Sequence, residues 1–210
     1  MKKLIFTILL SAFFLTSNAQ YFGLQAGALA SDILWRNDYY TYNTLPKPGF
    51  MAGITLDIPI KNTMAVNLAL NYKWTGASRA DSTNVEAVRL GYINLDATFN
   101  YIFETNVAVR PYIEGGGFAA YLVNASTIYV SENGDSYTEE VKVGTSKDDE
   151  IIPWDLGLTI GGGIYYRKWR FGAGYSATII DLSPTDEFIL RNSMGYLKAT
   201  FFFGKKNKNK

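Results

Sequence analysis

The feature that most constrains this chain is a strict alternation of apolar residues with polar or small ones. A period of two places successive side chains on opposite faces of a strand, so each alternating segment predicts one β-strand. Eight segments show this pattern: 22–28, 50–58, 66–75, 93–103, 108–123, 156–166, 169–177 and 193–203. The sequence therefore predicts an all-β protein with eight antiparallel strands.

The connections between these segments alternate in length. Short ones lie near 61–63, 104–106 and 167–168, and longer polar ones lie at about 31–48, 76–87, 124–154 and 178–192. Short turns at one end and long loops at the other are typical of an outer-membrane up-and-down β-barrel. Segments of about ten residues are also long enough for a tilted strand to cross a bilayer.

The 124–154 connection contains a second pattern. Two strand-like stretches, 127–131 and 137–143, flank Asn133-Gly134, which is a strong hairpin signal. We expect a hairpin here that projects beyond the membrane. A ten-stranded barrel is the alternative.

The first residues have the features of a secretory signal peptide. Lys2 and Lys3 precede an apolar stretch at 4–15, and Ser17-Asn18-Ala19 forms a small-x-small cleavage site. The apolar stretch is shorter than the roughly 20 residues that a membrane-spanning helix needs. We therefore expect a cleaved segment at 1–19, a barrel at 20–203 and a basic periplasmic tail at 204–210.

In each alternating segment, the polar or small residues lie on one face of the strand, and their composition indicates whether this face points to water outside the barrel or to its interior. A soluble lipocalin-like barrel has its apolar side chains inside and a Lys- and Glu-rich surface outside. Here the polar parity is rich in Gly, Asn, Thr and Ser, and charged residues make up only 19% of the chain, against about 25% on average. This composition favours a polar lumen inside a lipid-facing wall.

Seven charged residues lie at alternating positions that would point into the lumen of such a barrel. Because an eight-stranded barrel is just wide enough for its interior side chains, and an isolated buried charge is costly, these charges should pair and close the lumen. A small polar channel is the alternative. The predicted lumen ion network comprises Asp57, Lys73, Asp96, Arg110, Glu114, Arg170 and Lys198.

The absence of His and Cys excludes many chemistries. Without Cys there is no disulfide framework, thiolate zinc site or Cys nucleophile, and without His the commonest general base and metal ligand are missing. We therefore expect no enzyme activity, no catalytic or metal-binding residues and no cofactor. A net charge of +1 without a basic stripe gives no sign of nucleic-acid binding.

Two groups of aromatic residues are further candidates. Trp35, Tyr39, Tyr40 and Tyr42 cluster in the 31–48 connection, where they are suited either to contacts with sugars or a protein partner, or to the aromatic girdle. Phe201 and Phe203 stand near the end of the last segment. Barrels commonly carry a terminal aromatic assembly signal, so we assign this role to the two phenylalanines.

Four phrases carry a resemblance: FGLQAGALAS, GFMAGITLDIPI, VRPYIEGGGFAAYLV and DLGLTIGGGIYYRKWRFGAGYSATI. They resemble the outer-membrane β-barrel domain of Bacteroidetes, the PorT-like "porin family protein" group, and the shape is similar to OmpA/OmpX-type barrels. The resemblance implies an eight-stranded barrel in the cell outer membrane and no catalytic residues.

These observations favour an outer-membrane structural or interaction protein with a plugged polar lumen and acidic and aromatic surface loops. A small-solute porin and a soluble secreted barrel that binds a hydrophobic ligand are the alternatives. The expected partners are outer-membrane lipid, the barrel-assembly machinery, and a protein at the extracellular loops or the basic tail.

Overall fold

The computed structural model describes residues 21–37, 39–42, 44–80, 84–131, 136–185 and 187–203. The described part contains ten β-strands, and none of its segments is a helix that could cross a membrane. The strands are β1 (Tyr21–Arg36), β2 (Thr41–Tyr42), β3 (Leu45–Lys61), β4 (Met64–Ala80), β5 (Asn84–Ile102), β6 (Val109–Ser131), β7 (Ser136–Glu140), β8 (Trp154–Tyr166), β9 (Trp169–Thr178) and β10 (Ile189–Phe202).

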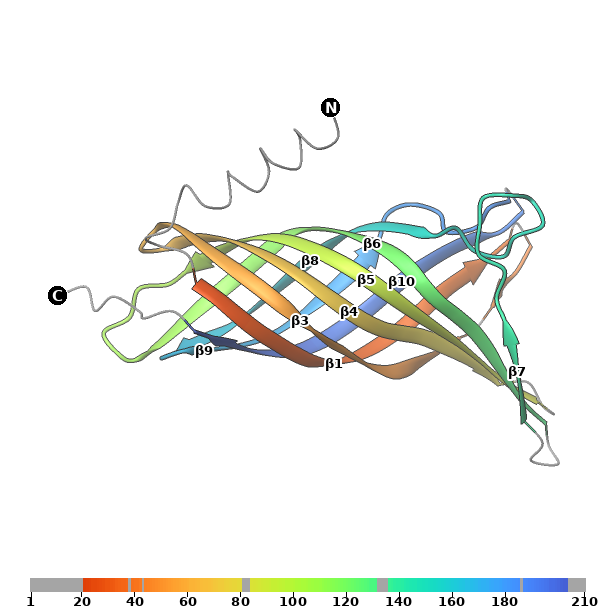
Figure 1. The fold of residues 1–210 in the computed structure, drawn as a ribbon, viewed down its shortest axis with the longest axis horizontal. Helices are drawn as coiled ribbons and strands as arrows, with labels where there is room; N and C mark the ends of the chain where they lie inside the picture. Colours follow the sequence, from red (N-terminus) through yellow and green to blue (C-terminus); the bar gives the residue numbers. More distant parts are fainter. Residues whose placement is uncertain are drawn as a thin grey trace.

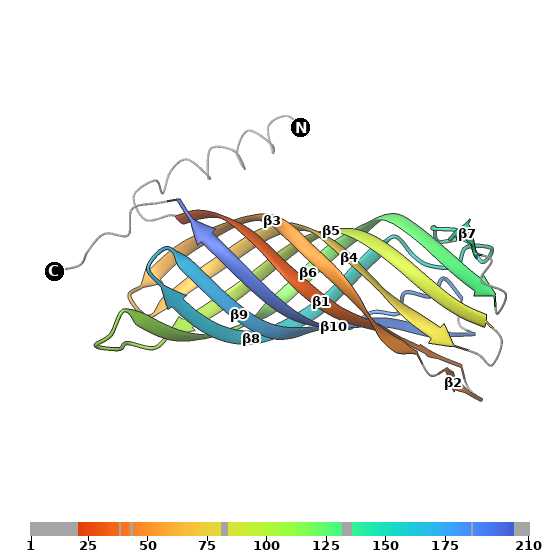
Figure 2. The ribbon, with the colours of Figure 1, turned by 90° about the horizontal axis from the view of Figure 1, so that it is seen from below.

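Eight of these strands close a ring. Antiparallel neighbours run in the order β1-β3-β4-β5-β6-β8-β9-β10, and β10 pairs back with β1 from Gly23↔Phe202 to Arg36↔Ile189 (Figures 1 and 2). The prediction of an eight-stranded antiparallel barrel is confirmed. The ten-stranded alternative is wrong, because β2 pairs only with β1 and β7 only with β6, outside the ring.

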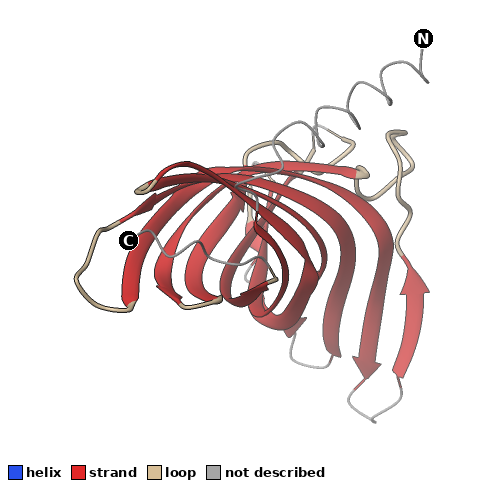
Figure 3. Cartoon of the chain, turned by 60° about the vertical axis from the view of Figure 1, so that its left-hand side comes forward, coloured by secondary structure: helices blue, strands red, loops and turns tan. Residues whose placement is uncertain are grey.

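The two ends of the barrel differ. The short connections at 62–63, 103–108 and 167–168 lie at one end, where β1 begins and β10 ends. At the other end the strands run on well past the alternating segments, and the hairpin of β6 and β7 projects from the wall (Figures 1 and 3). The alternation of short and long connections thus places all the long ones together.

Two predicted loops are largely strand. The prediction of a loop at 76–87 is wrong, because β4 continues to Ala80 and pairs with β5 up to Ala80↔Val85. In the 31–48 connection, β1 continues to Arg36 and β3 already begins at Leu45. The backbone ladder continues there regardless of side-chain polarity, whereas apolar alternation ends once both faces of the sheet leave the bilayer.

The two faces of the wall have opposite character. Large apolar side chains point outward and are exposed, as at Ile160 (69%) and Leu197 (64%). Polar side chains point inward and are buried, as at Asn71 (1%) and Thr200 (0%). This barrel has apolar side chains outside and polar side chains inside, which is the reverse of a soluble barrel. Such an outer surface is suited to contact with the lipid of a bilayer.

The predicted signal peptide at 1–19, the tail at 204–210 and the Asn133-Gly134 turn lie outside the described residues. The strands that flank this turn, β6 and β7, do form the expected hairpin.

Candidate functional site in the barrel lumen

The lumen near the short-turn end is closed by an ion pair between β9 and β3. Arg170 donates from Nη1 to Asp57 Oδ1 at 3.0 Å, and the side chains are 0% and 6% exposed. The Tyr165 hydroxyl donates to Asp57 Oδ2 at 2.9 Å, and Asn67 also donates to this carboxylate. The guanidinium lies 5.3–6.0 Å from the ring centroids of Phe202, Tyr165 and Tyr112. Ring faces therefore surround a charge that a single carboxylate neutralises.

A second ion pair joins β10 to β6. Lys198 Nζ lies 2.6 Å from Glu114 Oε1, and both side chains are buried. The Tyr196 hydroxyl donates to the same oxygen at 2.8 Å, while the Lys198 ammonium sits 5.0 Å from the centroid of the Tyr196 ring. Tyr196 also contacts Thr159, to which Ser176 donates at 2.9 Å. This chain of hydroxyls extends the cluster across β8 and β9.

A third ion pair joins β4 to β5. Lys73 donates to Asp96 Oδ1 at 3.1 Å, and Asn71 donates to Asp96 Oδ2 at 2.8 Å. Gln25 of β1 donates to Asn71 at 2.7 Å, and Lys73 lies 5.4 Å from the centroid of the Phe118 ring. Each of the three ion pairs is neutral in itself, so these six charges are compensated within the lumen.

Six of the seven predicted lumen charges thus occur in three pairs. The seventh, Arg110, is only half-buried, and its guanidinium lies 6.0 Å from the Tyr165 ring centroid. It stands near the short-turn mouth, beside the Arg170–Asp57 cluster but outside it. The tyrosines at 112, 165 and 196 contact these pairs but were not among the predicted network residues, although the alternation places them on the lumen-facing side of their strands.

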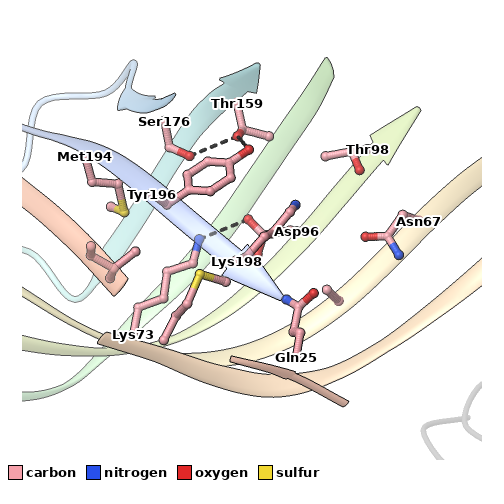
Figure 4. Close-up of a pocket in the computed structure, with 13 residues that line it drawn as sticks. Gln25, Asn67, Lys73, Asp96, Thr98, Thr159, Ser176, Met194, Tyr196 and Lys198 are labelled. Atoms are coloured by element: carbon pink, nitrogen blue, oxygen red, sulfur yellow. Dashed lines mark hydrogen bonds and ion pairs between the residues drawn. The ribbon is translucent and has the colours of Figure 1, made fainter. Parts of the chain in front are cut away.

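Little free space is left between the side chains. Figure 4 shows the cavity between Lys73, Asp96, Tyr196 and Lys198, and its volume is about 20 Å³. This is room for roughly one or two water molecules. This cavity is too small for a hydrated solute.

Glycines in the wall of β8 and β9 make room for the lumen tyrosines. A Cβ at Gly161 would lie 2.7 Å from the Tyr196 hydroxyl, and one at Gly172 would collide with the Tyr112 hydroxyl. The 161–163 glycines thus include a position where a tyrosine lies against the wall, as strand glycines permit. Among the 115–117 glycines, a Cβ added at Gly115 would meet no atom within 4 Å. Tight packing in the lumen therefore does not explain all three glycines of that group.

Replacing Gly172 by alanine should lower the free energy of unfolding by about 1–3 kcal/mol, because the new methyl group overpacks against Tyr112. The Tyr112 hydroxyl is buried and makes no hydrogen bond among the described residues, so Tyr112→Phe should cost little. The double variant should recover most of the loss, since the clashing atom is gone. Urea unfolding of the refolded barrel in detergent micelles measures this cycle. Additive losses would contradict the proposed clash.

The loop end of the lumen is closed in a different way, by an apolar plug. Leu182 and Ile151, from the two long connections, are 0% and 4% exposed and pack against lumen-facing residues of the strands. These partners include Ile33, Ala77, Leu90, Tyr92, Phe118, Ala120, Leu122 and Ala125. Ile152 N donates to Leu182 O at 2.9 Å, which ties the two connections together. We call this set the apolar plug.

A buried carboxylate lies below the plug. Asp155 is 1% exposed and accepts hydrogen bonds from Thr178 at 2.8 Å and Asn192 at 3.3 Å. Asn192 also donates to the Tyr92 hydroxyl at 3.0 Å. Asp155 stands one residue before the predicted segment at 156–166. Continuing the alternation of that segment by one residue would have placed Asp155 on the lumen-facing side. It forms no ion pair among the described residues.

The predicted surface aromatics are spread over the loop end. Tyr39 and Tyr40 are 86% and 70% exposed, and both backbone amides donate to the Asn37 side chain. Trp35 lies within β1 with its ring edge against Phe188. Tyr42 pairs with Trp35 through the backbone register, and its side chain lies outside what the structure describes.

The terminal phenylalanines lie at the short-turn end. Phe201 packs against Trp169 at a tilted angle with ring centroids 5.0 Å apart, and Phe203 stacks on Phe22 at 5.9 Å. The backbone of Phe203 donates to Phe22 O at 2.8 Å, which extends the ladder one residue past β10. These rings form part of an outward aromatic belt at this end, together with Tyr101, Phe103 and Tyr166.

The described carboxylates of the lumen take part in ion pairs or hydrogen bonds. Among the described residues, no group of three acidic side chains is placed to hold a metal ion. The lumen carboxylates at 57, 96 and 114 are each neutralised by one cation. A fourth carboxylate, Asp155, is held by the neutral donors Thr178 and Asn192.

Comparisons with known proteins bear on this architecture. No curated protein matches the chain. Among solved structures, Neisserial surface protein A (NspA) is similar, with 17% identity, a TM-score of 0.46 and coverage of 87% of this chain and 97% of that one. Ail, the attachment invasion locus protein of Yersinia pestis, shares 15% identity at a TM-score of 0.42, covering 88% of this chain and 99% of that one. The N-terminal β-barrel domain of Pseudomonas aeruginosa OprF shares 14% identity at a TM-score of 0.37, covering 86% and 97%.

A family model gives the assignment. The model described as "Outer membrane protein beta-barrel domain" matches residues 18–183, which contain seven of the eight ring strands. Its description agrees with the apolar outer wall and points to the outer membrane. The chain belongs to the outer membrane protein beta-barrel domain family.

Proposed function

We propose that this protein is a structural and interaction barrel, which displays its long loops outside the cell and conducts no solute. The observation that carries this proposal is the closure of the lumen at two levels, by three ion pairs below and by the apolar plug above. The outer strands meanwhile extend beyond the apolar wall and expose acidic and aromatic side chains. A protein of this shape acts by what it presents and contacts.

The expected partners follow from the described surfaces and, for the tail at 204–210, from the sequence alone. Lipid covers the apolar wall, the assembly machinery reads Phe201 and Phe203, and a protein partner docks at the extracellular loops or the basic tail. We further propose that the chain is of the PorT-like Bacteroidetes type, supported by the four sequence phrases quoted above. Enzyme activity is not proposed, since the chain has no His or Cys and the lumen carboxylates at 57, 96 and 114 are held in ion pairs.

The display can be tested with single cysteines, because the chain has none of its own. Lys147→Cys lies at an exposed position of the 141–153 connection, and Glu104→Cys lies at an exposed position of a short turn at the opposite end. A membrane-impermeant maleimide added to whole cells should label Lys147→Cys and should label Glu104→Cys only after the outer membrane is opened. Equal labelling of both in intact cells, or recovery in the soluble fraction, would overturn the proposal.

A planar-bilayer recording separates the proposed function from a small-solute porin. Because the central cavity holds only about 20 Å³, the refolded barrel should show no stable conductance steps in salt solution. A porin of known conductance, refolded in the same way, controls for insertion. Reproducible steps from the wild-type barrel would favour the porin function instead.

A further inference from the structure

The strand β7 is an open edge of the sheet. All five of its residues, Ser136–Glu140, are exposed, and its register pairs it with β6 alone. Figures 1 and 3 show it at the outer side of the hairpin that projects from the loop end. Among the described residues no backbone hydrogen bond outside the β6 ladder reaches Ser136–Glu140. Such an edge is a template for the addition of another strand.

The register identifies the backbone groups that point away from β6. Val141 N donates to Ala125 O, in the same register as Glu139↔Thr127 and Tyr137↔Tyr129. Hydrogen-bonded and non-hydrogen-bonded pairs alternate in an antiparallel ladder, so the backbones of Tyr137 and Glu139 face β6. The N–H and C=O groups of Thr138, with those of its neighbours at 136 and 140, therefore face the open edge.

The side chains around this edge are aromatic and acidic. Glu86, Tyr129 and Tyr137 stand directly across from one another on β5, β6 and β7. The two tyrosine rings stack with centroids 4.9 Å apart, and Tyr137 is 62% exposed. Burial, followed by the charges of Glu86 and Glu139, raises the pKa of the Tyr129 phenol above its ordinary value. The carboxylates therefore gather around the paired rings.

The charge of the edge indicates what can pair with it. Glu139 shares the face of Tyr137, and Glu140 lies on the opposite face, so β7 carries two carboxylates. Antiparallel pairing of β7 with β7 of a second copy, centred on Thr138, would place Glu139 opposite Tyr137 and Glu140 opposite Ser136, so neither glutamate would meet an opposite charge. A basic strand instead offers an opposite charge to each glutamate. Charge complementarity thus favours a different, basic protein segment over self-association.

We propose that the open edge of β7 binds an extended basic segment of a partner protein as an added antiparallel strand. Two adjacent basic residues of this segment lie opposite Glu140 and Glu139, and an aromatic residue two positions later lies opposite Tyr137 and extends the stacked row. This inference deepens the proposed display function by naming the chemistry of the partner at one surface. Backbone bonds give the affinity, and the side chains give the selectivity.

The test uses a labelled ten-residue peptide with the central sequence Lys-Lys-Thr-Tyr and the refolded barrel in detergent micelles, measured by fluorescence anisotropy. Thr138→Pro removes an open-edge N–H without removing a bond to β6, and should weaken binding about tenfold or more. Thr138→Val keeps this N–H and should bind as the wild type does. Glu139→Gln/Glu140→Gln should also weaken binding about tenfold, whereas Glu104→Gln/Glu187→Gln, which removes two exposed carboxylates elsewhere, should have no effect.

A peptide arm keeps the test independent of protein variants. In a second peptide, N-methyl groups replace the backbone N–H hydrogens on the edge that would meet β7. This peptide should not bind the unchanged barrel, because an added strand needs these N–H donors. Equal binding of the methylated peptide, or of wild type and Thr138→Pro, would overturn the inference. Dimers in sedimentation that Thr138→Pro abolishes would show a second copy as the occupant and would also overturn it. Surface labelling at Lys147→Cys tests the proposed display function without the peptide. A failure of the display function can therefore be distinguished from a failure of the strand-addition inference.

Discussion

Replacing Asp57 by asparagine should lower the free energy of unfolding of the barrel by about 3–5 kcal/mol. The guanidinium of Arg170 is completely buried, and Asp57 is the one carboxylate paired with it among the described residues. Asparagine keeps the size of the side chain and one carbonyl oxygen, so the change removes charge with little loss of packing. The cation is then left buried among three aromatic rings, which compensate only in part. Urea unfolding in detergent micelles, followed by tryptophan fluorescence, gives the value.

The double variant Asp57→Asn/Arg170→Gln controls for the general effect of substitution. It removes both charges, so at least half of the loss in the single variant should be recovered. Glu104→Gln changes an exposed carboxylate and should leave the unfolding curve unchanged. Losses at 57 and 170 that simply add would show that the two side chains are not coupled.

The architecture could be predicted because the sequence pattern has one clear physical cause. Where one face of a strand meets lipid and the other a packed polar lumen, alternation is strict, as in 66–75 and 93–103. Beyond the bilayer neither face has to be apolar, so the continuation of β4 to Ala80 and the start of β5 at Asn84 left no pattern. Strand number is therefore encoded in the alternation, whereas strand length beyond the membrane is not.

The lumen could be predicted only in part for a related reason. Parity places Asp57 and Arg170 on the inner face, but their pairing depends on the register of strands that are 113 residues apart in the chain. The tyrosines that hold the pairs look like any other aromatic residue of a barrel strand. The packing of Leu182 and Ile151 was not predicted, because short apolar stretches such as 151–152 and 179–182 within polar connections have no period to detect. Their role is visible only once the connections fold over the mouth of the barrel.

Replacing Leu182 by alanine should lower the free energy of unfolding by about 2–5 kcal/mol. The side chain is completely buried in the apolar plug, and neighbours that belong to β-strands cannot easily close the cavity. Its backbone N donates to Leu190 O at 2.8 Å and its carbonyl accepts from Ile152 N, so its position also orders the two long connections. Limited proteolysis of the variant should therefore cleave the 141–153 and 179–188 connections faster than in the wild type. Unfolding in urea gives the energy.

Ile179→Ala is the matched control, since it removes a similar side chain from the same connection at a position that is 56% exposed. It should change neither the unfolding curve nor the cleavage rate appreciably. If Leu182→Ala also leaves both unchanged, the mouth is not held by hydrophobic burial and the polar lumen alone closes the barrel. The effects of Leu182→Ala and Asp57→Asn should add, because the two sites lie at opposite ends of the lumen and share no partner. Additivity would show that the barrel is closed by two independent devices, a charged one near the periplasm and an apolar one beneath the displayed loops.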